Sequence, residues 1–159
     1  MMEGAIHQGI LDLKYRNLRS VAPALGGLLG QWLRTNTVPG EALVPVPLHH
    51  RRMRERGYNQ SALLTKEVGT LMEMPVASGV LVRTRDTLPQ VSLPREERSW
   101  SVEGSFACPE MVEEKSFILV DDVVTTGSTL SACASALKSA GASSVWGIAL
   151  ARQGRGPGT

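Results

Sequence analysis

Apolar residues recur at helical spacing in two stretches of the chain. The first stretch places them at i, i+3, i+4, i+7 and i+8: Leu25, Leu28, Leu29, Trp32 and Leu33. The second stretch repeats the pattern with Leu63, Leu64, Val68, Leu71 and Met72. Each pattern predicts an amphipathic helix that packs one face on a core. Pro23 lies near the start of the first helix, and Met74-Pro75 closes the second.

Other apolar runs have the length and composition of strands. Residues 42–47 (ALVPVP) contain two prolines, which indicates a strand that ends in a stiff loop, and residues 80–82 predict a short strand. Residues 117–124 are continuously apolar and β-branched up to two acids, as in a strand buried on both faces of a parallel sheet. A helix over 128–140, capped by Gly141, and a strand over 145–151 complete a βαβ unit. We therefore expect an α/β fold whose central, mostly parallel sheet is flanked by helices.

Polar and charged residues dominate positions 83–108, and Pro89 and Pro94 interrupt this segment. About 25 residues without a clear period, inside a compact domain, usually form a functional loop. We interpret the segment as a flexible lid that includes a short hairpin. Arg83, Gln90 and Arg98 are its candidate functional residues, and a closed lid would keep water from a reacting ligand.

Length and composition fit one soluble domain. The chain has 159 residues, of which 42% are hydrophobic and 20% charged, so we expect a single domain over 1–152 and a disordered tail over 153–159. It is expected to fold alone or as a homo-oligomer such as a homodimer. No apolar run reaches the roughly 18 residues of a membrane span, and the first residues do not resemble a signal peptide, so we expect a cytoplasmic protein. Cys108 and Cys133 form no CxxC pair and are expected to be free thiols.

The richest chemistry follows the predicted strand 117–124. Asp121 and Asp122 end its apolar run, and a loop of hydroxyl residues and one glycine leads into the next helix: Thr125, Thr126, Gly127, Ser128 and Thr129. The carboxyl end of a strand is where open α/β sheets bind ligands, and a helix N-terminus attracts phosphate. A plainer interpretation is that Ser128 or Thr126 only caps the helix and that the acids only end the strand. Two adjacent acids on an apolar strand put one of them near the core, which favours a partner or ligand.

The loop is neither of the common nucleotide-binding patterns. It has no GK[ST] of a Walker A sequence, and the chain has no GxGxxG. A pair of acids followed by a phosphate cradle suits a ribose 5-phosphate, because carboxylates accept hydrogen bonds from sugar hydroxyls. This combination resembles the signature of sites that bind 5-phosphoribosyl-1-pyrophosphate (PRPP), which is the expected ligand.

Charge is distributed unevenly along the chain. The net charge is only +2, but four arginines lie within six residues: Arg51, Arg52, Arg54 and Arg56. Such a cluster attracts phosphate or nucleic acid, whereas a solvated surface loop is the plainer interpretation. Arg51 and Arg56 are candidate pyrophosphate ligands, because a guanidinium fork binds two oxygens. His49 and His50 stand beside them, and a catalytic role for either remains the weaker interpretation.

Two segments carry a resemblance to a known family. ILVDDVVTTGSTL, residues 118–130, resembles the PRPP motif of type I phosphoribosyltransferases, and VPVPLHHRRMRERGYNQ, residues 44–60, resembles the ComF family of competence-associated phosphoribosyltransferase-like proteins. Lys14-Tyr15 and a set of later residues agree with that family: Thr87, Gln90, Leu93, Arg98, Gly104 and Phe106. The similarity covers most of residues 10–152. Ser101 departs from the asparagine that is usual there, and the family's frequent N-terminal zinc ribbon is not seen in this sequence, which we interpret as loss or as a late start codon.

The resemblance implies a type I phosphoribosyltransferase-like fold and roles for individual residues. Asp121 and Asp122 would be the catalytic acids that hold the ribose hydroxyls, and residues 125–129 would bind the 5′-phosphate. The loop after the first strand would present its backbone to pyrophosphate: Val46, Pro47, Leu48 and His49. Mg²⁺ would be bound mainly through PRPP, with no direct protein cage.

Three functions follow from these features. The first is a Mg²⁺-dependent phosphoribosyltransferase that releases pyrophosphate and whose acceptor the sequence does not name. The second is a non-catalytic accessory protein that binds single-stranded DNA or the competence machinery, which the arginine cluster favours. Base stacking would call for exposed aromatics, and only seven of the 159 residues are Phe, Trp or Tyr. The third is a PRPP sensor that keeps the ligand site without turnover.

Overall fold

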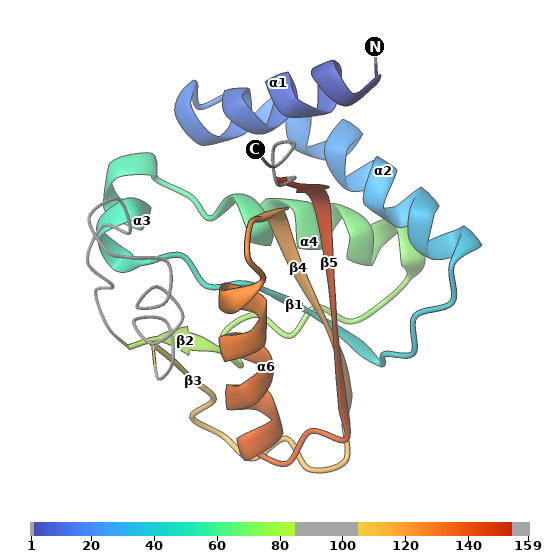
Figure 1. The fold of residues 1–159 in the computed structure, drawn as a ribbon, viewed down its shortest axis with the longest axis vertical. Helices are drawn as coiled ribbons and strands as arrows, with labels where there is room; N and C mark the ends of the chain where they lie inside the picture. Colours follow the sequence, from blue (N-terminus) through green and yellow to red (C-terminus); the bar gives the residue numbers. More distant parts are fainter. Residues whose placement is uncertain (1, 85–104, 154–159) are drawn as a thin grey trace, which may run out of the picture.

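A three-stranded parallel sheet forms the centre of the molecule (Figure 1). The computed structural model describes residues 2–84 and 105–153. The strands β1 (Ala42–Pro45), β4 (Ser116–Val124) and β5 (Ser144–Arg152) lie in the order β1-β4-β5, with Val44 paired to Leu119 and Leu119 to Gly147. The predicted α/β architecture is confirmed, as are both strands of the expected βαβ unit.

Helices cover both faces of this sheet. α2 (Ala22–Thr35) and α4 (Gln60–Met72) pack on one face, and α6 (Ser128–Ser139) packs on the other (Figure 1). α2 and α4 are the two helices that the apolar stripes predicted. The N-terminal helix α1 (Met2–Tyr15) and the 3-10 turn η1 (Arg19–Val21) precede them, and α1 lies near the carboxyl end of β5.

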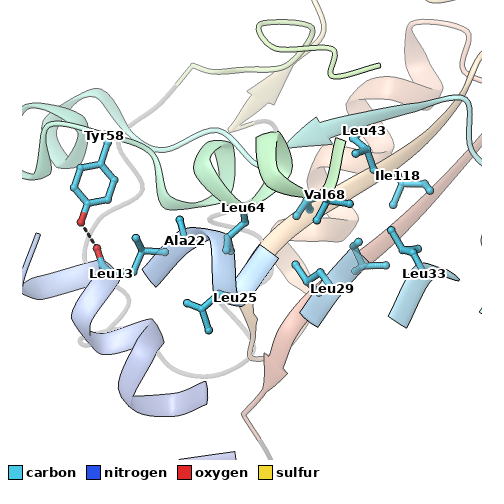
Figure 2. Packing of buried hydrophobic residues seen from close by; sticks show 12 residues of the cluster. Leu13, Ala22, Leu25, Leu29, Leu33, Leu43, Tyr58, Leu64, Val68 and Ile118 are labelled. Carbon is cyan, nitrogen blue, oxygen red and sulfur yellow. Dashed lines mark hydrogen bonds between the residues drawn. The ribbon is translucent and has the colours of Figure 1, made fainter. Parts of the chain in front are cut away.

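Strand β4 separates two apolar clusters because its side chains alternate between the two faces of the sheet. Ile118 and Val120 belong to the cluster with α1, α2 and α4, and Phe117 and Leu119 belong to the cluster under α6. Figure 2 shows the first cluster, including the Tyr58 hydroxyl that donates a hydrogen bond to the carbonyl oxygen of Leu13. This bond connects the end of α1 to the segment before α4.

The basic stretch is a helix and not the surface loop that its sequence suggested. α3 (His50–Arg56) is capped at its start by His49, whose Nδ1 accepts a hydrogen bond from the Arg51 N–H at 3.1 Å. It ends at Gly57, which has a φ of 80°. The two caps provide the local reason for a helix that has no apolar period of its own.

The segment predicted as a lid is described only at its two ends. β2 (Val82–Arg83) pairs with β3 (Phe106–Ala107) in an antiparallel ladder, so the two ends of the predicted lid segment lie side by side. Gln90 and Arg98 lie outside the described residues, and so does the predicted tail from 154 onward. Gln153, the first residue of the predicted disordered tail, donates its backbone N–H to the Val124 carbonyl oxygen at 2.8 Å, one residue beyond the end of β5. No helix in residues 2–84 and 105–153 is long and apolar enough to cross a bilayer.

Candidate active site

Two adjacent carboxylates at the end of β4 point to different surroundings. Asp122 follows Val120 on the face covered by α1, α2 and α4, and only 3% of the residue is exposed. Its Oδ2 lies 2.9 Å from Nζ of Lys14 at the end of α1, in an ion pair that lacks hydrogen-bond geometry. A buried charge needs such a partner, because desolvation without one is costly. The ion pair therefore joins α1 to the end of the central strand.

Asp121 is held by hydrogen bonds to one of its two oxygens. Its Oδ1 accepts from the Ser61 hydroxyl at 2.9 Å and from the Asp122 backbone N–H at 2.9 Å. Burial, and then the neighbouring charge of Asp122, raise the pKa of Asp121 to about 6, and Lys14 opposes that rise. A carboxyl group with a raised pKa in a recess is typical of a functional site.

The loop after β4 has the geometry of an anion-binding helix start. Gly127 caps α6 with a φ of 85° and offers no side chain to the first turn. The Thr126 and Ser128 hydroxyl oxygens lie 2.9 Å apart, and the Ser128 N–H donates to Thr126 Oγ1 at 3.3 Å. The first N–H groups of a helix point outward, and together with these hydroxyls they can bind a phosphate.

These elements surround a hollow of about 170 Å³ at the carboxyl end of the sheet. The loop after β1 forms one wall, and the Asn59 side-chain amide fixes it by donating to the Val46 carbonyl oxygen at 2.9 Å. The lining residues come from seven segments of the chain: Lys14, Tyr15, Val46, Pro47, Leu48, Arg52, Arg56, Asn59, Gln60, Ser61, Arg83, Asp121, Asp122, Val123 and Thr129. We call this space the acid hollow.

Eight of the fourteen predicted site residues in the described part of the chain meet at the acid hollow. They are Val46, Pro47, Leu48, Arg56, Arg83, Asp121, Asp122 and Thr129. The other loop residues, Thr125 to Ser128, connect its acids to Thr129. Within the described residues, His49 and Arg51 do not line it: His49 is buried as the cap of α3, and Arg51 pairs with Glu55 at 3.1 Å.

The structure adds residues to which the sequence had given no role in the site. Lys14 and Tyr15 come from α1, Arg52 from the inner side of α3, and Ser61 from the first turn of α4. Arg52 and Arg56 are four residues apart and therefore share one helix face. That i, i+4 spacing was the available signal for Arg52, whereas nothing local relates Lys14 to the acids.

The oxygen ligands in the acid hollow suit a metal ion that takes most of its ligands from water or from a bound phosphate. Among residues 2–84 and 105–153, no group of three or more His, Cys, Asp or Glu side chains is placed to hold a metal ion. Asp121 keeps Oδ2 without a hydrogen-bond partner in that part of the chain. One carboxylate oxygen beside a phosphate loop fits Mg²⁺, which prefers few protein ligands and bridges phosphate oxygens.

Comparisons with known proteins agree with this geometry. The model of the phosphoribosyl transferase domain family matches residues 72–158. Competence protein F of Haemophilus influenzae is 35% identical over 116 residues, which are 70% of this chain and 51% of that protein. The DNA utilization protein YhgH of Escherichia coli is 34% identical over 145 residues, 88% of this chain and 62% of that protein. The chain thus spans about half to two thirds of the length of these relatives.

Solved structures share the fold. The glutamine PRPP amidotransferase of B. subtilis has a TM-score of 0.56 at 21% identity, covering 83% of this chain and 26% of that one. A hypoxanthine phosphoribosyltransferase from Staphylococcus aureus has a TM-score of 0.53 at 13% identity, covering 85% and 65%. At these identities the likeness shows the type I phosphoribosyltransferase fold, and the two curated relatives confirm the expected resemblance to the ComF family. The chain belongs to the phosphoribosyl transferase domain family.

Proposed function

We propose that the chain binds PRPP with Mg²⁺ in the acid hollow and transfers its phosphoribosyl group to an acceptor. The observation that carries the proposal is that Asp121, its Ser61 partner and Thr129 line one recess together with the loop after β1. The family membership and the shared fold support the same function.

Different described residues would bind different parts of PRPP. The first turn of α6 and residues 125–129 would hold the 5′-phosphate, and Asp121 would accept hydrogen bonds from the ribose hydroxyls. The backbone of residues 46–48 and the Arg56 guanidinium lie where pyrophosphate could be bound. Mg²⁺ would neutralise charge on the pyrophosphate, with Asp121 as the protein carboxylate best placed to support it.

The reaction needs positioning more than covalent chemistry from the protein. The acceptor forms a bond to the anomeric carbon of ribose while the bond from that carbon to the pyrophosphate oxygen breaks. The electron pair leaves with pyrophosphate, and the acceptor's proton passes to pyrophosphate or to water. Binding both ends of PRPP in one recess aligns these atoms and lowers the entropic barrier.

Titration calorimetry with PRPP and Mg²⁺ tests the proposal. Asp121→Asn keeps the size of the side chain but removes its charge, and losing a hydrogen bond to a charged group costs about 1.5–3 kcal/mol, which is about a 10- to 150-fold loss of affinity. Asp12→Asn is the matched control, because Asp12 lies on α1 and contacts Gln8 and Arg16. The proposal fails if saturating PRPP with Mg²⁺ gives neither binding heat nor a higher melting temperature. A pyrophosphate-release assay over bases and amines then distinguishes an enzyme from a PRPP sensor.

A second candidate function is DNA handling, which is favoured by the similarity to the DNA utilization protein YhgH of Escherichia coli. Arg51 and Arg54 lie on α3, are exposed, and do not line the acid hollow within the described residues. If they bind phosphates of DNA, single-strand affinity should fall steeply with salt, and Arg51→Gln with Arg54→Gln should reduce that slope. Equal affinity and slope in parent and variant would exclude this role for α3.

A further inference from the structure

A second hollow adjoins the first and is lined by cations and one aromatic ring. It encloses about 340 Å³ and is lined by Lys14, Tyr15, Arg52, Glu55 and Arg56. All of these except Glu55 also line the acid hollow, so the two spaces are neighbours that share four side chains. Its volume lies in the range of about 300–1,000 Å³ that is typical of small-molecule sites. We call it the α1–α3 hollow.

The charges of the α1–α3 hollow are only partly neutralised. Lys14 is paired with Asp122, and Glu55 is paired with Arg51 at 3.1 Å. Arg56 donates a hydrogen bond to the neutral side chain of Gln60. Arg52 is exposed, and its guanidinium makes no ion pair or hydrogen bond with the described residues. The hollow therefore presents at least one guanidinium that has a free fork for an acidic group.

Tyr15 gives the same hollow a flat apolar surface. The residue is 75% exposed, and Cζ of Arg56 lies 5.9 Å from the centroid of its ring. An exposed aromatic ring beside a guanidinium plane can stack on a planar ligand, and such stacking contributes about 1–3 kcal/mol for a base. Pyrophosphate has no flat face and gains nothing from this surface.

We infer that the α1–α3 hollow is the acceptor subsite and that it selects a planar aromatic molecule carrying a carboxylate. The inference rests on the proposed function, because that function places the anomeric carbon in the adjoining acid hollow. Tyr15 stacks on the ring of the acceptor, Arg52 binds its carboxylate through two N–H groups, and Arg56 lies where the two hollows meet. A neutral base of the same shape loses the contact with Arg52.

Matched pairs of planar compounds test the inference by calorimetry. The pairs are orotate with uracil and benzoate with benzamide, titrated into the full chain alone and with ribose 5-phosphate, which fills the first hollow without reacting. At least one acid should bind about tenfold more tightly than its neutral match. Arg52→Gln should remove most of that preference, Tyr15→Ala should weaken both members of the pair, and Arg54→Gln on the same helix should change neither.

Several results would overturn the inference. One is an equal affinity for the acid and the neutral compound in both pairs. Another is an Arg52→Gln variant that loses as much affinity for PRPP as for the acid, since Arg52 would then serve pyrophosphate. A different result would separate the two proposals. If the chain binds orotate through Arg52 and Tyr15 but does not bind PRPP, the α1–α3 hollow is a site for planar acids, and the proposed phosphoribosyl transfer is contradicted.

Discussion

Lys14→Met removes a charge and keeps most of the length of the side chain. In the folded protein, Nζ of Lys14 lies 2.9 Å from Oδ2 of Asp122, and Asp122 is only 3% exposed. The substitution therefore leaves a buried carboxylate without its ion-pair partner. Breaking a fully buried pair costs about 3–5 kcal/mol. The Lys14 side chain is 21% exposed, so water can partly replace the lysine, and we expect a loss nearer the cost of an unsatisfied buried group, about 1–3 kcal/mol.

Urea unfolding at pH 7, followed by far-ultraviolet circular dichroism, measures this loss. Asp122→Asn in the Lys14→Met background should recover much of it, because no buried charge then remains. The double-mutant cycle should give a coupling of about 1–3 kcal/mol. Tyr58→Phe is the control, since it removes a neutral polar contact of α1, the hydrogen bond to the Leu13 carbonyl oxygen, at a cost of about 1 kcal/mol and without a change of charge.

The same variants should differ in how PRPP binding depends on pH. Lys14 lowers the pKa of Asp121, so its loss should raise that pKa above about 6 and shift the midpoint of the binding profile upward. Tyr58→Phe should leave the midpoint in place. A Lys14→Met chain that loses less than about 0.5 kcal/mol and shows no coupling to Asp122 would refute the account of the ion pair.

Three further predictions concern the acid, the helix contact and the helix start. The pKa of Asp121 is raised in the folded state, so the free energy of unfolding should fall as pH rises from about 4 to 6. Unfolding free energies measured at pH 5 and 7 should therefore show that Asp121→Asn is stabilised relative to the parent chain by more at pH 7 than at pH 5. Gly26→Ala should destabilise, since its Cβ would lie 2.5 Å from Cβ of Glu67, whereas Gly27→Ala meets nothing within 4 Å and should stabilise by about 0.5–1 kcal/mol in the same unfolding assay. Gly127→Ala forces a side chain into the left-handed region at about 1–2 kcal/mol, and calorimetry should show weaker PRPP binding; unchanged binding would remove this glycine from the phosphate loop.

Local patterns predicted the central sheet and the phosphate loop because their signals lie within a few residues. The apolar run of β4, the acids after it and the glycine before α6 can all be found in one short segment. α1 was not predicted, although Ile6, Ile10 and Leu13 stand at i, i+4 and i+7: three apolar positions are a shorter stripe than the five of α2 or α4. The helical state of α3 depends on its caps, His49 and Gly57, and not on a period.

The composition of the site could not be predicted in the same way. Lys14 and Asp122 are more than 100 residues apart, and Ser61 and Asp121 are 60 residues apart. Such pairs depend on how α1 and α4 pack against the sheet, which no local spacing encodes. The arginines were visible as a cluster, but which of them turn inward depends on the orientation of α3.

The sequence left open which of the two acids would face the ligand, and the structure gives them different tasks. Asp122 is buried and its charge is already neutralised by Lys14, so its main effect is to hold α1 and Tyr15 beside the site. Asp121 keeps one oxygen without a hydrogen-bond partner in the described residues and lines the acid hollow, and burial raises its pKa to about 6. It follows that Asp122→Asn should act first on stability and on the α1–α3 hollow, whereas Asp121→Asn should act first on PRPP. Equal losses of PRPP affinity in both variants, with unchanged unfolding curves, would contradict this division between two adjacent carboxylates.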